Sequence, residues 1–179
     1  MLKRLCTAVG GLLLLAVNPA QAAPKDWEKA STIARNLLVV GAVGLPLVKS
    51  DGDGALQAAG SVGAAFLVSE GLKRTFPEMR PDGSNRRSFP SGHTATAFAA
   101  AASLQNRQGW QVGIPAQLIA AFVGLARVKG DKHHWYDVVA GAAVGEASGF
   151  LITSRYRQDV QAMPWADSKG GGLTMAMHF

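Results

Sequence analysis

The sequence predicts an all-α fold: a compact antiparallel bundle of about five helices, embedded in a membrane. Long apolar stretches alternate with short polar breaks, and no long stretch has the period-two alternation of a β-strand. Apolar residues make up 48% of the chain and charged residues only 17%. Ala and Gly recur along the apolar stretches, and such small residues let helix backbones pack closely, as they do in membrane bundles.

The first 22 residues have the pattern of a secretory signal peptide. Two basic residues precede an apolar run over 5–17, and Ala20-Gln21-Ala22 resembles a cleavage site. Because the run is shorter than the roughly 20 residues that span a bilayer, we expect residues 1–22 to be removed on export. An uncleaved anchor helix is the alternative. The only cysteine, Cys6, lies in this segment, so the mature chain would contain no disulfide and no cysteine-based site.

Beyond this segment, apolar periodicity and turn residues predict the helices and the domain boundaries. The expected helices cover 26–48, 55–75, 91–106, 112–128 and 136–156. Breaks are expected at the turn-rich segment 49–54 and at Gly109. The helical domain would cover 23–163, and Pro164 with the glycines that follow it predicts a flexible C-terminal tail over 164–179.

Three short segments gather the groups that a phosphate-binding site needs. In chain order they are Lys73 with Arg80-Pro81, then Pro90-Ser91-Gly92-His93, then Arg127 with His133 and Asp137. Fixed cations bind phosphate oxygens, and a Ser-Gly turn that opens a helix presents backbone N–H groups to an anion. Each residue alone also has a plain structural interpretation, such as a helix cap or a solvated loop histidine. The ordered set with these spacings favours a site.

The order of the expected helices brings these segments together. The first ends the second helix, the second begins the third helix, and the third joins the fourth helix to the fifth. If consecutive helices run antiparallel, all three segments meet at one end of the bundle.

These segments resemble the signature of the type 2 phosphatidate phosphatase superfamily. Its members include lipid phosphate phosphatases, bacterial nonspecific acid phosphatases and vanadium-dependent haloperoxidases. The resemblance covers about residues 73–137, and it departs from the family pattern at Ala126, where a Ser is usual before the arginine of the third motif. The resemblance implies a helical phosphatase that needs no metal and no cofactor.

The resemblance also implies a role for each motif residue. His133 would be the nucleophile and form a phospho-histidine, with Asp137 accepting a hydrogen bond from one ring nitrogen. His93 would protonate the leaving oxygen as general acid and later activate water. The residues that would bind the substrate phosphate are Lys73, Arg80, Ser91, Gly92 and Arg127. His134, next to the nucleophile, is expected to be a bystander.

Charge and ligand types exclude two other classes of site. The net charge of +6 suits anionic partners such as phosphate esters or acidic headgroups, but no nucleic-acid-binding module or aromatic ladder is present. His133, His134 and Asp137 together could suggest zinc. No fourth ligand cluster accompanies them, and the arginines nearby would repel a cation, so we expect no metal.

Several features favour a membrane location over a soluble one. The uncharged runs 54–69 and 108–126 approach the roughly 17–25 residues of a membrane span. Trp27, Trp110 and Trp135 fall near expected helix ends, as in an interfacial belt. The loops opposite the motifs carry a modest excess of basic residues: Lys49, Arg107, Arg155 and Arg157. We expect an exported inner-membrane protein whose site faces the periplasm, with a soluble periplasmic protein as the alternative.

The sequence therefore predicts a metal-independent phosphatase that acts on a phosphate or pyrophosphate ester, most readily that of a membrane lipid. Three alternatives stay open. They are a soluble periplasmic nonspecific acid phosphatase, a vanadium-dependent haloperoxidase and an inactive membrane scaffold. Nothing in the sequence identifies the leaving group or the oligomeric state.

Overall fold

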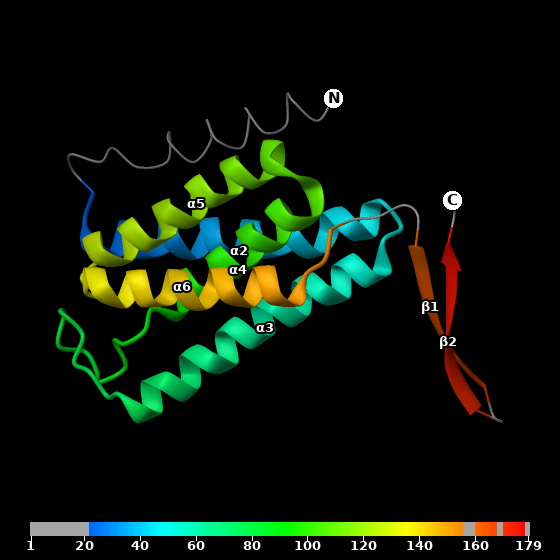
Figure 1. Ribbon diagram of the computed structural model, residues 1–179. Coiled ribbons are helices and arrows are strands. Elements are labelled where there is room, and N and C mark those ends of the chain that lie inside the picture. Colours follow the sequence, from blue (N-terminus) through cyan, green and yellow to red (C-terminus); the bar gives the residue numbers. More distant parts are fainter. Residues whose placement is uncertain (1–21, 156–159, 168–169, 178–179) are drawn as a thin grey trace.

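The computed structural model describes residues 22–155, 160–167 and 170–177, and the helices of this part form an antiparallel bundle (Figure 1). They are α2 (Pro24–Val48), α3 (Gly52–Thr75), α4 (Gly92–Gln108), α5 (Trp110–Lys129) and α6 (Trp135–Ile152). The all-α bundle predicted from the sequence is confirmed, and each helix lies close to its expected range. Apart from Ala22, the expected signal peptide lies outside the described residues.

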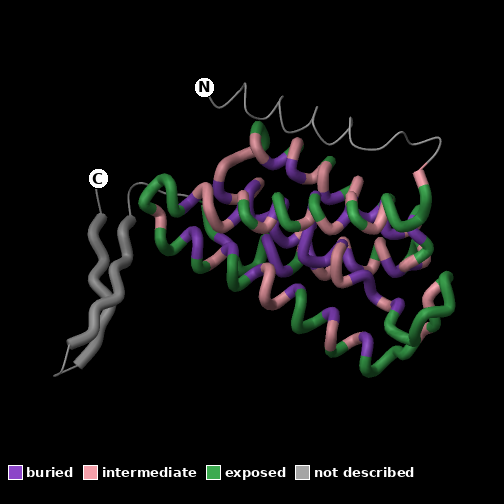
Figure 2. Tube along the Cα trace, turned by 180° about the vertical axis from the view of Figure 1, so that it is seen from behind, coloured by how far each residue is buried: buried purple, intermediate pink, exposed green. Residues whose placement is uncertain are grey.

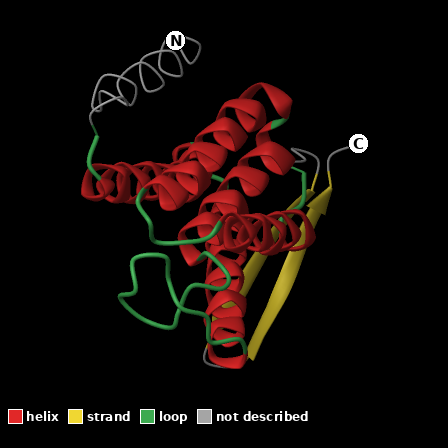
Figure 3. Ribbon diagram, turned by 90° about the vertical axis from the view of Figure 1, so that its left-hand side faces the viewer, coloured by secondary structure: helices red, strands yellow, loops and turns green. Residues whose placement is uncertain are grey.

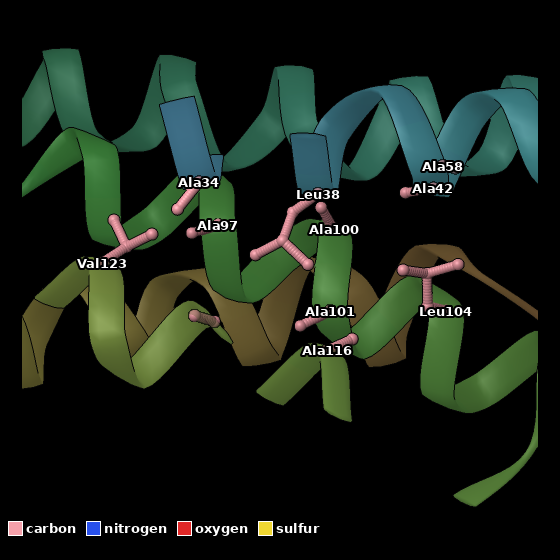
Figure 4. Packing of buried hydrophobic residues seen from close by; sticks show 11 residues of the cluster. Ala34, Leu38, Ala42, Ala58, Ala97, Ala100, Ala101, Leu104, Ala116 and Val123 are labelled. Atoms are coloured by element: carbon pink, nitrogen blue, oxygen red, sulfur yellow. The ribbon is translucent and has the colours of Figure 1, made fainter. Parts of the chain in front are cut away.

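α4 is the central helix of the bundle and packs against the other four. Its alanines at 95, 97 and 99–102 are fully buried. Because these side chains are small, four helices can surround α4 at close range, and the buried residues concentrate in the middle of the bundle (Figure 2). On one side Ala97, Ala100 and Ala101 pack among Leu38 of α2 and Val123 of α5 (Figure 4).

The face of α6 that packs on α4 carries glycines at every fourth residue: Gly141, Gly145 and Gly149. A Cβ atom at Gly141 would lie 2.5 Å from the Ser91 carbonyl oxygen, and one at Gly145 would overlap the Ala95 carbonyl oxygen. The α6 backbone therefore lies directly on the α4 backbone, the close approach that the Gly-rich composition predicts.

The end of the bundle near residue 51 is fixed by a buried ion pair. Arg107 of α4 pairs with Asp51 and donates to Gln57 Oε1 at 2.8 Å and to the Ser154 carbonyl at 3.0 Å. Asp51 also caps α3, because its Oδ1 accepts from the Gly54 N–H at 2.9 Å. Two expectations change as a result: the break at 49–54 is shorter than expected, and Arg107 is a buried structural residue rather than a loop cation.

The outer surface of the bundle is apolar. Large exposed apolar side chains lie on α2, α3, α5 and α6, and none of those in the described part lies on α4. By length and composition, the helices Pro24–Val48, Gly52–Thr75 and Trp110–Lys129 could each cross a membrane. An exterior of this kind favours contact with lipid over contact with water.

The C-terminal segment differs from the flexible tail expected over 164–179. Strands β1 (Val160–Asp167) and β2 (Gly170–Met177) pair antiparallel in a two-stranded sheet beside the bundle (Figure 1). The triple glycine 170–172 lies inside β2, and Trp165 is paired with Gly172. Pairing satisfies the backbone groups that face the partner strand, a contact that the glycine-rich composition does not reveal.

Candidate active site

All three motifs lie at one end of the bundle, as the helix order predicts. The start of α2, the end of α3, the start of α4, the end of α5 and the start of α6 meet there (Figure 1). Figure 3 looks at this end, with the loops that join α3 to α4 and α5 to α6 facing the viewer.

His133 lies in the loop between α5 and α6, and its side chain is 2% exposed. Its Nδ1 lies 2.8 Å from the Ser88 carbonyl oxygen and 3.6 Å from Asp137 Oδ2. A carbonyl only accepts hydrogen bonds, so Nδ1 carries the proton and Nε2 keeps its lone pair. The sequence predicted Asp137 as the acceptor for this ring, but the Ser88 carbonyl is the nearer one.

Asp137 is fully buried and orients the groups around His133. Its Oδ2 accepts from the Ser88 hydroxyl at 2.5 Å and from the His134 N–H at 2.8 Å. The carboxylate thereby fixes Ser88, and the Ser88 carbonyl fixes the His133 ring. Burial lowers the pKa of His133 below its ordinary value of 6.5; Asp137 opposes this shift, and the charges of Arg127 and Arg80 add to it.

His93 lies in the first turn of α4, where a hydroxyl of α2 orients it. Thr32 Oγ1 lies 3.3 Å from His93 Nε2 and 3.1 Å from the Glu28 carbonyl oxygen. When the Thr32 proton lies on that carbonyl, the Thr32 oxygen accepts from the His93 Nε2–H, and Nδ1 is the ring nitrogen that does not contact Thr32.

Three cations surround the two histidines. Lys73 is buried in the last turn of α3, and its Nζ donates to the Pro90 carbonyl at 2.7 Å. Arg127 donates to the Ser31 hydroxyl at 3.4 Å. The Nε atoms of Arg80 and Arg127 are buried without a hydrogen-bond partner, and both arginines act electrostatically on His93 and His133. Guanidinium N–H groups of this kind are suited to donate to phosphate oxygens.

Ser91 and Gly92 hold the start of α4 in place. Ser91 is fully buried and caps α4, since its Oγ accepts from the Thr94 N–H at 3.4 Å and the Thr94 hydroxyl at 2.9 Å. The Ser91 backbone N–H donates to the Asp137 carbonyl at 2.9 Å, so this N–H is not available to a phosphate. A Cβ atom at Gly92 would lie 3.3 Å from Lys73 Nζ, so glycine lets the lysine approach the helix start.

His134 is the N-cap residue of α6 and lies beside the site. Its ring stacks on Tyr136 with centroids 5.0 Å apart, and its Nδ1 lies 3.3 Å from Asp137 Oδ2. Together with Glu78, His134 and Asp137 form the one group in the described residues that brings three ligand-type side chains within reach of a metal ion. One oxygen of each carboxylate is engaged, Asp137 Oδ2 by the Ser88 hydroxyl and Glu78 Oε1 by the Tyr136 hydroxyl, whereas Asp137 Oδ1 is buried without a hydrogen-bond partner in the described residues.

Comparison with known proteins decides the family. The family model described as the PAP2 superfamily matches residues 54–160. The chain belongs to the PAP2 superfamily. This confirms the resemblance drawn from the three motifs.

Similar PAP2 proteins include lipid phosphatases from bacteria. A lipid A 4'-phosphatase from Helicobacter pylori is 30% identical over 162 residues, which cover 81% of each chain. A lipid A 1-phosphatase from Porphyromonas gingivalis is 40% identical over 89 residues, which are 48% of this chain and 20% of that longer protein.

Two solved structures share the fold. LpxE from Aquifex aeolicus superposes with a TM-score of 0.63 at 21% identity, over 78% of this chain and 89% of that chain. A transmembrane PAP2-type phosphatidylglycerolphosphate phosphatase from Bacillus subtilis gives 0.58 at 24% identity, over 84% of each.

Sequence reasoning missed four residues of the site: Ser88, Ser31, Thr32 and Arg35. Ser88 acts through its backbone carbonyl, which a sequence does not reveal. The other three lie on α2, before the segment that matches the family model. A signal was present, because polar residues and an arginine one turn apart in an apolar helix commonly mark a functional face.

Proposed function

We propose that this protein is a membrane-embedded lipid phosphatase that works through a phospho-histidine at His133. The observation that carries the proposal is the convergence of two histidines, each oriented through one ring nitrogen, with three cations at one end of an apolar bundle. Family membership and the lipid phosphatases among the relatives support it.

The geometry supports a two-step reaction. His133 Nε2 attacks the phosphorus, a nitrogen–phosphorus bond forms, and the bond to the leaving oxygen breaks. Protonated His93 donates from Nδ1 to that oxygen; burial and the charge of Arg127 lower the pKa of His93 to about 3, and the negative charge of a bound phosphate opposes this shift. Water then attacks the phospho-histidine while His93 takes its proton, which releases phosphate and regenerates His133. Lys73, Arg80 and Arg127 stabilise the charge on the equatorial oxygens in both steps.

An apolar groove beside the site supports a lipid as the substrate. It has a volume of about 770 Å³ and lies where the end of α3 meets the start of α6. The residues that line it are Leu72, Thr75, Phe76, Pro77, Glu78, Phe89 and Tyr136. Phe89 directly precedes the second motif and Tyr136 directly precedes Asp137, so the groove adjoins the reacting groups. We assign it to an acyl or prenyl chain of the substrate.

We also propose that the reaction needs no metal. The three cations supply the positive charge that a divalent ion supplies in other phosphatases. A metal at Glu78, His134 and Asp137 would compete with the hydrogen bonds by which Asp137 holds Ser88 and the start of α6.

The location is proposed from the sequence and the fold together. The signal-like N-terminus predicts export, and the apolar exterior supports insertion in the inner membrane. The motif-bearing end would then face the periplasm.

Phosphate release by the full-length protein in detergent tests this function. The panel contains phospholipid monophosphates, prenyl diphosphates, lipid A and water-soluble esters, each with and without EDTA. We expect release from lipids, unchanged by EDTA and inhibited by orthovanadate, which mimics five-coordinate phosphorus.

Activity restored only by added metal contradicts metal independence. Release from soluble esters alone by protein extracted without detergent indicates an acid phosphatase. Halide oxidation that depends on added vanadate would indicate a haloperoxidase. If the protein turns over none of these substrates, it is an inactive scaffold.

A further inference from the structure

Helix α2 presents a polar face to the active site. Ser31 is fully buried and accepts from Arg127 at 3.4 Å, and Thr32 contacts His93 at 3.3 Å. Arg35 follows Ser31 by four residues and Thr32 by three, so it lies on the same face, one turn further along α2. Glu28, one turn before Thr32, pairs instead with Lys132 at 3.5 Å.

Arg35 is a charged residue without a partner in a helix apolar enough to cross a membrane. Its Nε is buried and makes no hydrogen bond, and no acidic residue of the described chain pairs with it. Its charge acts on His93 and on Arg127. Glu28 and Asp82 offset part of the repulsion at Arg127, but no acidic residue of the described chain pairs with Arg35, so an anion bound beside Arg35 and Arg127 would be favourable.

The neighbours of Arg35 place it on the side of the leaving group. Thr32 lies 3.3 Å from His93 Nε2, and Arg35 is three residues after Thr32 on the same face of α2. The charge of Arg35 also acts on His93. Since His93 protonates the leaving oxygen, a group that lies near both His93 and Arg35 belongs to the leaving group rather than to the transferred phosphoryl group.

We propose that Ser31, Thr32 and Arg35 form a subsite for an anionic leaving group, so that the preferred substrate is a lipid diphosphate. This inference rests on the proposed phosphatase function. His133 Nε2 bonds to the terminal phosphorus, and the bond from that phosphorus to the bridging oxygen breaks. The electron pair stays on the bridging oxygen, which leaves with the lipid monophosphate. Arg35 neutralises the charge that develops there, and His93 supplies the proton.

A binding measurement tests the subsite without turnover. Inorganic pyrophosphate and inorganic phosphate are titrated into the full-length protein in detergent. We expect pyrophosphate to bind at least about tenfold more tightly than phosphate, and Arg35→Gln to remove that advantage. Lys29→Gln, which removes one positive charge from an exposed position of the same helix, should keep it. Equal affinities in the wild type, or equal losses for both ligands in Arg35→Gln, would overturn the proposal.

Turnover separates this inference from the proposed function. A prenyl diphosphate and the matching monophosphate are compared for each variant. Arg35→Gln should lower the ratio of the two kcat/KM values about 10- to 100-fold, and Arg35→Lys should recover part of the loss. If Arg35→Gln hydrolyses both substrates and the ratio of their kcat/KM values is unchanged, only the subsite is refuted. Hydrolysis of both substrates that survives in His133→Ala refutes the proposed mechanism instead.

Discussion

At the residue scale, each histidine of the site is oriented by an acceptor from another element. The Ser88 carbonyl holds His133 through Nδ1, and the Thr32 hydroxyl holds His93 through Nε2. An imidazole held through one nitrogen presents the other in a defined protonation state. The two rings are thus held differently, which suits the tasks proposed for them: attack through Nε2 of His133 and proton transfer at Nδ1 of His93.

We predict that His133→Ala lowers kcat roughly a thousandfold or more, because it removes the proposed nucleophile. Phosphate release from a lipid substrate measures the loss. His134→Ala is the matched control: it removes the ring and keeps the backbone N–H that binds Asp137, so activity should stay within about tenfold of the wild type. Comparable losses in the two variants would mean that the nucleophile is misassigned.

The lowered pKa of His133 predicts the pH dependence. As the proposed nucleophile, His133 must be neutral to attack, so a lowered pKa keeps it active below pH 6.5. In the plot of kcat/KM against pH, the fall on the acidic side should therefore lie below pH 6.5. Asp137 raises this pKa, so Asp137→Asn should move this fall to still lower pH and reduce the maximal rate, because a less basic imidazole is a weaker nucleophile.

Profiles for the wild type and Asp137→Asn, recorded on one substrate, check this shift. The ionisation of the substrate is then the same in both. If the acidic side of the Asp137→Asn profile moves to higher pH or stays in place, the charge of Asp137 does not act on His133.

The motifs alone predict which residues gather at the site but not how they are held. Lys73, His93, Arg127 and His133 meet as their spacing and the helix order indicate. Ser88 was not predictable, because its contribution is a backbone carbonyl whose direction depends on the fold of the loop over 76–91.

At the element scale, the contact between α4 and α6 depends on glycines. A methyl group at Gly145 would overlap the Ala95 carbonyl oxygen and Phe98 Cβ. We predict that Gly145→Ala costs about 1–3 kcal/mol or more, since the helices must separate, and thermal unfolding in detergent measures this.

Gly63→Ala on α3 is the control for Gly145→Ala, because a methyl group there meets nothing within 4 Å. It should be neutral or stabilising by about 0.4–1 kcal/mol. If Gly145→Ala is as harmless as Gly63→Ala, α6 does not pack directly on α4.

The helices were predictable because their signals are local, and the hairpin was not. Ser91 before α4 and Gly109 between α4 and α5 mark boundaries through capping and a positive φ. The strands Val160–Asp167 and Gly170–Met177 depend on pairing with each other, and the three glycines of the second strand have low strand propensity.

At the scale of the whole molecule, the apolar exterior and the charged end belong together. A bundle whose outer helices expose apolar side chains is stable where lipid covers them. The cations at 73, 80 and 127 all lie at one end, where a phosphorylated headgroup would meet them. In the proposed reaction a lipid substrate would need no transfer out of the membrane, because its chain would occupy the apolar groove while its phosphate met the histidines.

The signal-like N-terminus predicts that the motif-bearing end faces the periplasm. Ser84 lies exposed in the loop at that end, and Asp53 lies exposed at the opposite end, in the first turn of α3. In a Cys6→Ser background, Ser84→Cys should react with an impermeant maleimide in intact spheroplasts, whereas Asp53→Cys should react only after the membrane is permeabilised. Labelling at both positions would indicate a soluble periplasmic protein. Labelling at Asp53→Cys alone would invert the topology and place the phosphatase site on the cytoplasmic face.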